Sequence, residues 1–273
     1  MNDLLNHPAV QAAAAPFIAG LLTAALLYRA RLGGLAVVAG FATAVALISG
    51  FNFTPLTATR KVVLLGLLAP LLGMVVDLVL KSNRRSYIVL AVLAALAAVW
   101  VFWSVLVQKE LAEAIRLGAI VSAATGLIVA LTVSLGGKPV RAASAGLALG
   151  LGSGICAVLA ASALYGQYGV AVGAACGAFL LLQMMLGRGL AAGATFTLSA
   201  ALLTGLFGAA AMLLASMPWY AFALLVLVPL AARVPLPEKM PVWLQSILVS
   251  ICALLPALPA FYLTWTAASG TTG

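Results

Sequence analysis

The chain has 273 residues, of which 65% are hydrophobic and only 7% are charged. Soluble domains carry about 25% charged residues, so this composition excludes a soluble globular protein and leaves no room for a separate soluble domain. We expect one integral membrane domain over residues 1–273. The net charge of +9 does not indicate nucleic-acid binding, because the basic residues fall in short connections between apolar runs, where they set membrane topology.

Ten apolar runs are long enough to form transmembrane helices, which predicts an all-α polytopic membrane protein. The predicted spans cover residues 8–28, 33–51, 61–80, 86–107, 112–135, 141–164, 167–186, 190–214, 217–233 and 242–265. The N-terminal segment has no basic n-region, so we expect the first span to be retained rather than cleaved as a signal peptide.

The basic residues predict the orientation of these spans. Even connections hold four of them, Arg60, Lys61, Lys109 and Arg116. Odd connections hold the other ten: Arg29, Arg31, Lys81, Arg84, Arg85, Lys138, Arg141, Arg188, Arg233 and Lys239. Because basic connections favour the cytoplasmic side, we expect both termini outside, in the periplasm of a bacterial inner membrane.

The aromatic residues favour the same topology. Trp and Tyr gather at membrane–water interfaces, because their rings are apolar and their polar atoms prefer water. The expected outer belt consists of Trp100, Trp103, Tyr165, Tyr168, Trp219, Tyr220, Tyr262 and Trp265.

The third span carries the most informative pattern. Gly66, Pro70, Gly73 and Asp77 follow one another at i, i+4, i+7 and i+11, so they share one face of a helix. Small residues allow another helix to approach closely, which predicts that this face points into the protein. Asp77 is the only acid in a long apolar run.

Two interpretations of Asp77 remain open. Lys81 lies four residues further on, so the two side chains could form a local pair at the membrane boundary. Alternatively, Asp77 is a proton or cation site, because carboxylates inside a membrane are costly and tend to be functional.

Prolines and basic residues supply two further candidate features. Pro256 and Pro259 interrupt the tenth span near mid-depth, where broken helices often line transport sites, although such a kink can also serve packing alone. Arg60 and Lys61 are basic residues on the predicted outer side. They are candidates for an outer mouth that attracts anions, or they simply mark where the third span enters the interface.

Glycines recur every four residues in spans 6 and 7, and such faces predict close helix contacts. The positions are Gly146, Gly150, Gly154, Gly169, Gly173 and Gly177. They indicate either an internal packing face or a homodimer interface.

A weak internal similarity relates residues 35–50 to residues 190–205, with seven of sixteen positions identical. If it marks a repeat, spans 1–4 correspond to spans 7–10 in the same orientation, a parallel repeat of the kind that transporters use.

The inventory of reactive side chains argues against an enzyme. The chain has one histidine and five acids, four of them at tails or connections, and its three cysteines lie in apolar runs. We therefore expect no catalytic residues, no metal and no cofactor. Two functions remain: a small secondary transporter or exporter of an apolar, amphipathic or lipid-like solute, and a non-catalytic integral subunit of a larger membrane complex. The expected partners are the lipid bilayer and either a membrane protein or a second copy of the chain.

Overall fold

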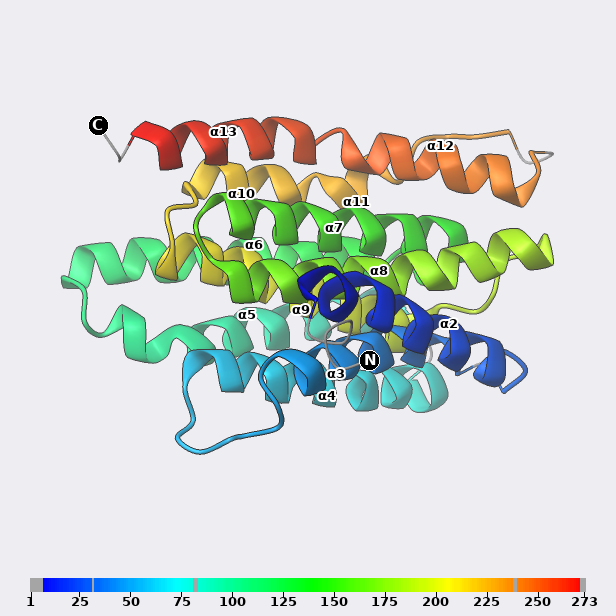
Figure 1. Cartoon of the computed structure of the whole chain (residues 1–273), viewed down its shortest axis with the longest axis horizontal. Coiled ribbons are helices and arrows are strands. Elements are labelled where there is room, and N and C mark those ends of the chain that lie inside the picture. The colour runs from blue at the N-terminus through cyan, green and yellow to red at the C-terminus, as the bar shows by residue number, and fades with distance from the viewer. Residues whose placement is uncertain (1–6, 31, 81–82, 238–239, 271–273) are drawn as a thin grey trace.

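A computed structural model describes residues 7–30, 32–80, 83–237 and 240–270, and within these ranges the chain is all helical, without strands (Figure 1). The first six helices are α2 (Ala15–Leu27), α3 (Ala36–Ile48), α4 (Ala58–Val75), α5 (Arg84–Leu106), α6 (Leu111–Val133) and α7 (Pro139–Leu159). The remaining six are α8 (Ala163–Leu186), α9 (Gly193–Leu214), α10 (Trp219–Val226), α11 (Val228–Ala231), α12 (Val242–Leu254) and α13 (Ala257–Gly270). Short irregular turns of helix precede α2 at Val10–Ala14, precede α3 at Gly33–Leu35, and extend α4 at Val76–Leu80.

The described helices confirm a polytopic membrane protein. Within the described ranges, eight helical segments are long and apolar enough to cross a membrane. Two shorter apolar segments, Gly33–Ile48 and Trp219–Ala231, occupy the positions of predicted spans 2 and 9. At 1.5 Å per residue these two extend only about 20–24 Å, less than the ~30 Å hydrocarbon core, so they are shorter than the sequence predicts.

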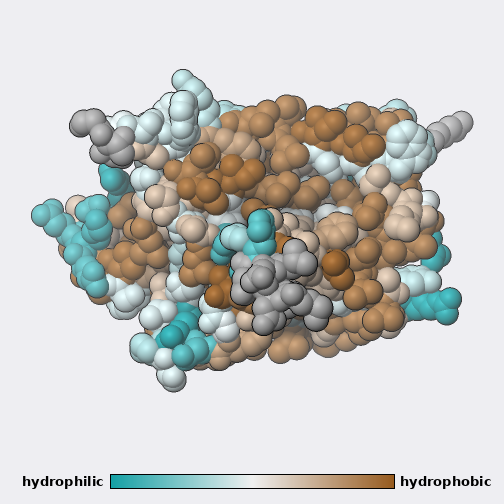
Figure 2. All heavy atoms as spheres, in the orientation of Figure 1, coloured by the Kyte–Doolittle hydropathy of each residue, from teal (hydrophilic) through white to brown (hydrophobic). Residues whose placement is uncertain are grey.

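The surface has the polarity of a membrane-embedded bundle. The helices lie roughly along the long axis of the molecule (Figure 1). Apolar residues cover most of its middle, apart from a small hydrophilic patch on this face, and hydrophilic residues gather towards both ends (Figure 2). The exposed aromatic side chains include Trp100, Trp103, Trp219, Tyr262 and Trp265, as an interfacial belt requires. Tyr165 and Tyr168 are instead buried, so their assignment to the belt is wrong.

Helix α9 lies at the centre of the bundle. In its most apolar stretch 83% of the residues are buried, and it packs against α4, α6, α7 and α8. Three of its buried hydroxyl side chains, those of Thr197, Ser199 and Thr204, avoid unpaired burial by donating to carbonyls of their own helix, as Ser199 does to the Thr195 carbonyl at 2.8 Å. Helices α12 and α13 pack on α7, on the far side of the bundle from α4 (Figure 1).

The glycines of α7 and α8 lie where these two helices meet. A Cβ on Gly150 would lie 2.5 Å from the Cα of Gly173, and a Cβ on Gly154 would lie 2.7 Å from the backbone nitrogen of Val170. The two backbones are therefore in direct contact along this face. Gly169 faces Gly154 in the same way, Gly146 faces the Cys176 side chain, and Gly177 meets only the side chain of Leu147.

Candidate functional site

The face of α4 that the sequence singles out packs against α9. A Cβ on Gly73 would lie 2.5 Å from the Cα of Thr195, and a Cβ on Gly66 would contact the side chains of Leu203 and Phe41. Pro70 is buried between them. We call this contact the α4–α9 seam; it comprises Gly66, Pro70, Gly73 and Asp77 on the α4 side, and Thr195, Ser199 and Leu203 on α9.

Asp77 binds the beginning of α9. Its Oδ1 accepts a hydrogen bond from the Ala194 backbone N–H at 2.7 Å. Its Oδ2 accepts from the Thr195 backbone N–H at 2.9 Å and from the Thr195 hydroxyl at 2.8 Å. The first N–H groups of a helix have no partner within the helix, and the helix dipole places positive potential there. The carboxylate therefore caps α9 from a different helix.

Gly193 makes room for this cap. Its φ is +61°, and a Cβ there would lie 2.8 Å from the Asp77 carboxyl carbon. Only glycine combines this backbone conformation with so close an approach. The residue before it, Ala192, offers no side-chain cap of its own, so α9 depends on Asp77.

Neither sequence interpretation anticipates this role of Asp77. Lys81, its proposed local partner, lies outside the described residues. The signal that was overlooked is at the other end of the contact: a helix that begins with Ala-Gly-Ala-Thr has no capping Ser, Asp or Asn at its start, which indicates a cap from elsewhere.

A hollow of about 300 Å³ gives access to Asp77 from the end of the bundle. Its lining includes Ala30 and Leu32 before α3, Met74 and Leu78 beside Asp77, and Thr195. Among the described residues that line the hollow, only Asp77 has a titratable side chain. Water or a small cation in the hollow would therefore meet this carboxylate beside apolar side chains.

Four aromatic side chains occupy the opposite end of the seam. Phe41 meets Tyr168 edge-on at 5.5 Å between ring centroids, and Phe207 lies 6.1–6.3 Å from the rings of Tyr168 and Tyr165. We call this cluster the aromatic plug. It continues the seam, because Phe41 also faces Gly66.

Two tyrosine hydroxyls tie the aromatic plug to α3 and α4. The Tyr168 hydroxyl is 2.6 Å from the Ser49 hydroxyl, and the Tyr165 hydroxyl is 2.9 Å from that of Thr59. Both rings are almost fully buried. A buried tyrosine hydroxyl needs a partner, and these partners lie at the end of α3 and the beginning of α4.

Replacing Tyr168 with phenylalanine should remove the bond to Ser49 and lower the free energy of unfolding by about 1 kcal/mol. Thermal unfolding in detergent measures the loss. Tyr262→Phe is the control, because the Tyr262 side chain is exposed. Equal stability of the Tyr168 and Tyr262 variants would show that the hydroxyl pair contributes nothing.

Arg60 and Lys61 lie near the beginning of α4, at the end opposite Asp77, and both donate to backbone carbonyls of other segments. Arg60 donates to the Pro55 carbonyl at 2.6 Å, and Lys61 donates to the Trp100 carbonyl at 3.1 Å and lies over the Trp100 ring. The sixteen residues from Lys61 to Asp77 correspond to about 24 Å of helix, so these basic residues and Asp77 do not form one site.

The two prolines of the last span also lie apart from Asp77. Helix α12 ends at Leu254 and α13 begins at Ala257, so the helix is interrupted at Pro256, as the sequence predicts. Pro256 is half-buried and Pro259 is exposed. Because α13 packs on α7 and α10, these prolines and α4 do not line a common path.

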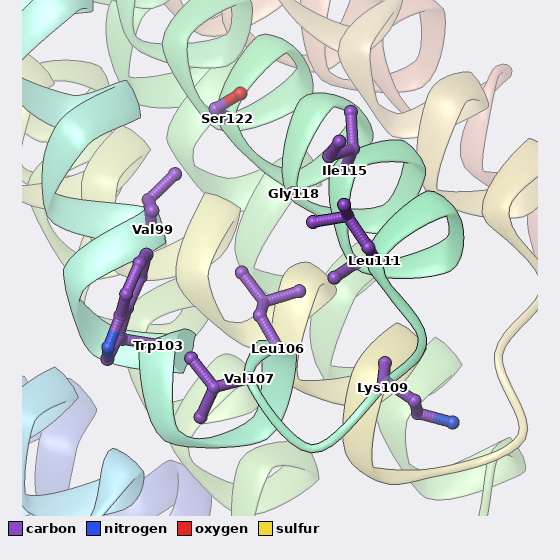
Figure 3. Close-up of a pocket in the computed structure, with 10 residues that line it drawn as sticks. Val99, Trp103, Leu106, Val107, Lys109, Leu111, Ile115, Gly118 and Ser122 are labelled. Atoms are coloured by element: carbon purple, nitrogen blue, oxygen red, sulfur yellow. The ribbon is translucent and has the colours of Figure 1, made fainter.

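Outside the seam, an apolar groove of about 550 Å³ separates the ends of α5 and α6 (Figure 3). Trp103, Leu106, Leu111 and Ile115 line it, and Lys109 points away from it and pairs with Glu113 at 3.6 Å. Lys109 is the one charged residue among the described residues that line the groove, and in a membrane the apolar remainder of the lining would face lipid.

No protein-family model and no curated protein matches this chain. Within the described ranges, His, Cys, Asp and Glu nowhere form a group of three that could hold a metal ion. The α4–α9 seam brings together a carboxylate, a proline-containing helix and a buried aromatic cluster.

Proposed function

We propose that the protein is a small secondary transporter or exporter in a bacterial inner membrane, and that its solute passes along the α4–α9 seam. The observation that carries the proposal is the arrangement of polar groups on this seam. A carboxylate that water can reach lies at one end, tyrosine hydroxyls lie at the other, and apolar side chains close the space between. A closed path with polar ends is what an occluded transporter requires.

Asp77 is the proposed coupling residue. Binding of a proton or Na⁺ from the hollow would neutralise the carboxylate and weaken its attraction to the N–H groups that begin α9. A protonated carboxyl also turns one of its two acceptor oxygens into a donor, so it no longer offers full acceptors to all three of its donors. Either change releases α4 from the beginning of α9 and opens the seam on the side of the hollow.

Pro70 and the irregular turn at Val76–Leu80 supply the flexibility that this opening needs. Proline removes one hydrogen bond inside α4, and helical turns with an extra residue are frequent at functional sites. The apolar lining of the seam, with Phe41, Leu203 and Phe207, favours an apolar, amphipathic or lipid-like solute over an ion or a sugar.

Accessibility of a single cysteine tests this function without knowledge of the solute. In a chain whose three cysteines are replaced by alanine, Ser199→Cys places a thiol in the middle of the seam, where burial is complete. A water-soluble maleimide should label it slowly in membrane vesicles, because the seam opens during the cycle. Labelling should respond to pH or to Na⁺ when Asp77 is present, and to neither in Asp77→Asn.

The matched control keeps only Cys176, which is equally buried but lies against Gly146 of α7. This thiol should stay unlabelled, because backbone contact holds α7 and α8 together. Equal labelling at both positions would indicate unfolding rather than transport, and absence of labelling at Ser199→Cys would contradict the proposal.

A non-catalytic membrane subunit is the second candidate, and the exposed apolar groove between α5 and α6 favours it. Native mass spectrometry after gentle detergent extraction separates the two functions. A stoichiometric protein partner would support the subunit. A monomer or homodimer would support the transporter.

A further inference from the structure

A second hollow, of about 560 Å³, lies at the same end of the bundle as Asp77. It is formed where the end of α2 meets the connection between α8 and α9. Tyr28, Arg29, Arg188, Gly189, Leu190 and Ala191 line it. We call it the arginine hollow. Hydrophilic residues gather at this end of the molecule, where α2 ends (Figure 2).

Two arginines from distant parts of the chain share one aromatic ring there. The guanidinium carbons of Arg29 and Arg188 lie 5.9 Å and 5.7 Å from the centre of the Tyr28 ring. Arg29 also donates to the Tyr28 hydroxyl at 3.2 Å. Stacking on one ring orders both guanidinium groups although each side chain is exposed.

No acidic residue in the described ranges neutralises these two positive charges. Among the described residues, neither arginine forms an ion pair, and the lining of the hollow contains no acid. The positive field reaches Tyr28: the hydrogen bond and the charge of Arg29 hold the pKa of the phenol below its usual value. Two like charges held together without a counter-ion favour an anionic ligand.

Backbone N–H groups strengthen the same preference. In the part of the chain that the structure describes, the N–H groups of Gly189 and Ala191 have no hydrogen-bond acceptor, whereas Leu190 between them donates inward to Gln183. The amide nitrogen of Gln183 is fully buried and has no acceptor within the described residues either. Exposed N–H groups next to arginines are a recurring anion-binding arrangement.

We propose that the arginine hollow binds a phosphate group, carried by an anionic lipid headgroup or by a free solute. The planar guanidinium groups of Arg29 and Arg188 match phosphate oxygens in two-point contacts, and the connection between α8 and α9 contributes N–H donors. The site is independent of transport along the α4–α9 seam and does not require it.

The test compares native mass spectra of detergent-purified protein titrated with phosphatidylglycerol, phosphatidylcholine or inorganic phosphate. Phosphatidylglycerol or inorganic phosphate should bind, and Arg29→Gln with Arg188→Gln should weaken that binding at least tenfold. Arg84→Gln is the matched control, since Arg84 is an exposed arginine at the predicted same side of the membrane, outside the hollow.

The two sources give different results. Preference for phosphatidylglycerol over inorganic phosphate, lost in the double variant, would identify a lipid site. Saturable binding of inorganic phosphate, lost in the same variant, would identify a soluble ligand. Binding that is the same in the wild type, the double variant and Arg84→Gln would overturn the proposal. Because the exposed arginines are not needed for packing, both variants should retain the fold. Thermal unfolding of both variants checks this.

Discussion

Asp77→Ala is expected to lower the free energy of unfolding by about 2 kcal/mol or more and to abolish any coupled transport. The change removes the protein acceptor of the N–H groups of Ala194 and Thr195, two buried residues, and only water from the hollow could replace it. A buried donor without an acceptor costs about 1–3 kcal/mol. Thermal unfolding in detergent measures the loss of overall stability. Hydrogen exchange at the beginning of α9 measures the local loss of protection at the uncapped N–H groups.

Asp77→Asn separates capping from coupling. The amide oxygen can accept from the Thr195 N–H and hydroxyl in place of Oδ2, but the amide nitrogen then faces the Ala194 N–H, so only part of the cap should remain while the negative charge is gone. Stability above that of Asp77→Ala with lost pH or Na⁺ response supports Asp77 as the coupling residue. Full activity of Asp77→Asn would mean that the carboxylate serves only to cap α9. An unchanged unfolding temperature in Asp77→Ala would refute the cap itself.

Gly150→Ala is expected to destabilise the protein by about 3 kcal/mol or more. The new methyl group would collide with backbone atoms of Gly173, and a backbone cannot move aside as a flexible side chain can. Overpacking of this kind typically costs 1–3 kcal/mol, and here α7 and α8 must separate to relieve it. The unfolding temperature in detergent and the yield of folded protein report the loss.

Gly177→Ala is the matched control for that variant. Gly177 lies on the face of α8 that carries Gly173 and packs on α7. A Cβ on Gly177 would meet only the Leu147 side chain at 3.4 Å, an ordinary contact. Similar losses from both substitutions would contradict the role of backbone contact, because alanine favours a helix over glycine at both positions. Because these glycines face each other within one chain, a larger residue at Gly150 or Gly173 should disrupt the fold before it disturbs any partner.

The sequence predicted the helical segments well and their surroundings less well. Hydropathy and turn residues place all ten segments within a few residues of where the helices begin and end. The same pattern overestimates the lengths of Gly33–Ile48 and Trp219–Ala231, because apolar residues in the adjoining connections extend each apolar run beyond its helix. Tyr165 and Tyr168 were misassigned because a membrane interface and a buried hydroxyl pair favour the same residue type.

The sequence predicts one side of the candidate site, on α4, but not the other side, on α9. Periodicity alone identifies the face of α4 that carries Gly73 and Asp77, since only local geometry is involved. Its partner could not be predicted, because Thr195 is 118 residues away and nothing in single-sequence periodicity relates the two. The tyrosine–hydroxyl pairs that join α8 to α3 and α4 could not be predicted for the same reason.

The long separation between Asp77 and α9 has a consequence for biosynthesis. Helices α7 and α8 follow one another directly, so they can pair as a hairpin as soon as both are in the membrane. Helix α4 enters the membrane long before its cap partner exists, since Ala194 is synthesised 117 residues after Asp77. A nascent chain that has not yet reached Gly193 presents this carboxylate at the membrane border with none of its three donors. Completion of α9 is therefore the event that anchors α4, and shorter nascent chains should be preferred targets of membrane quality-control proteases.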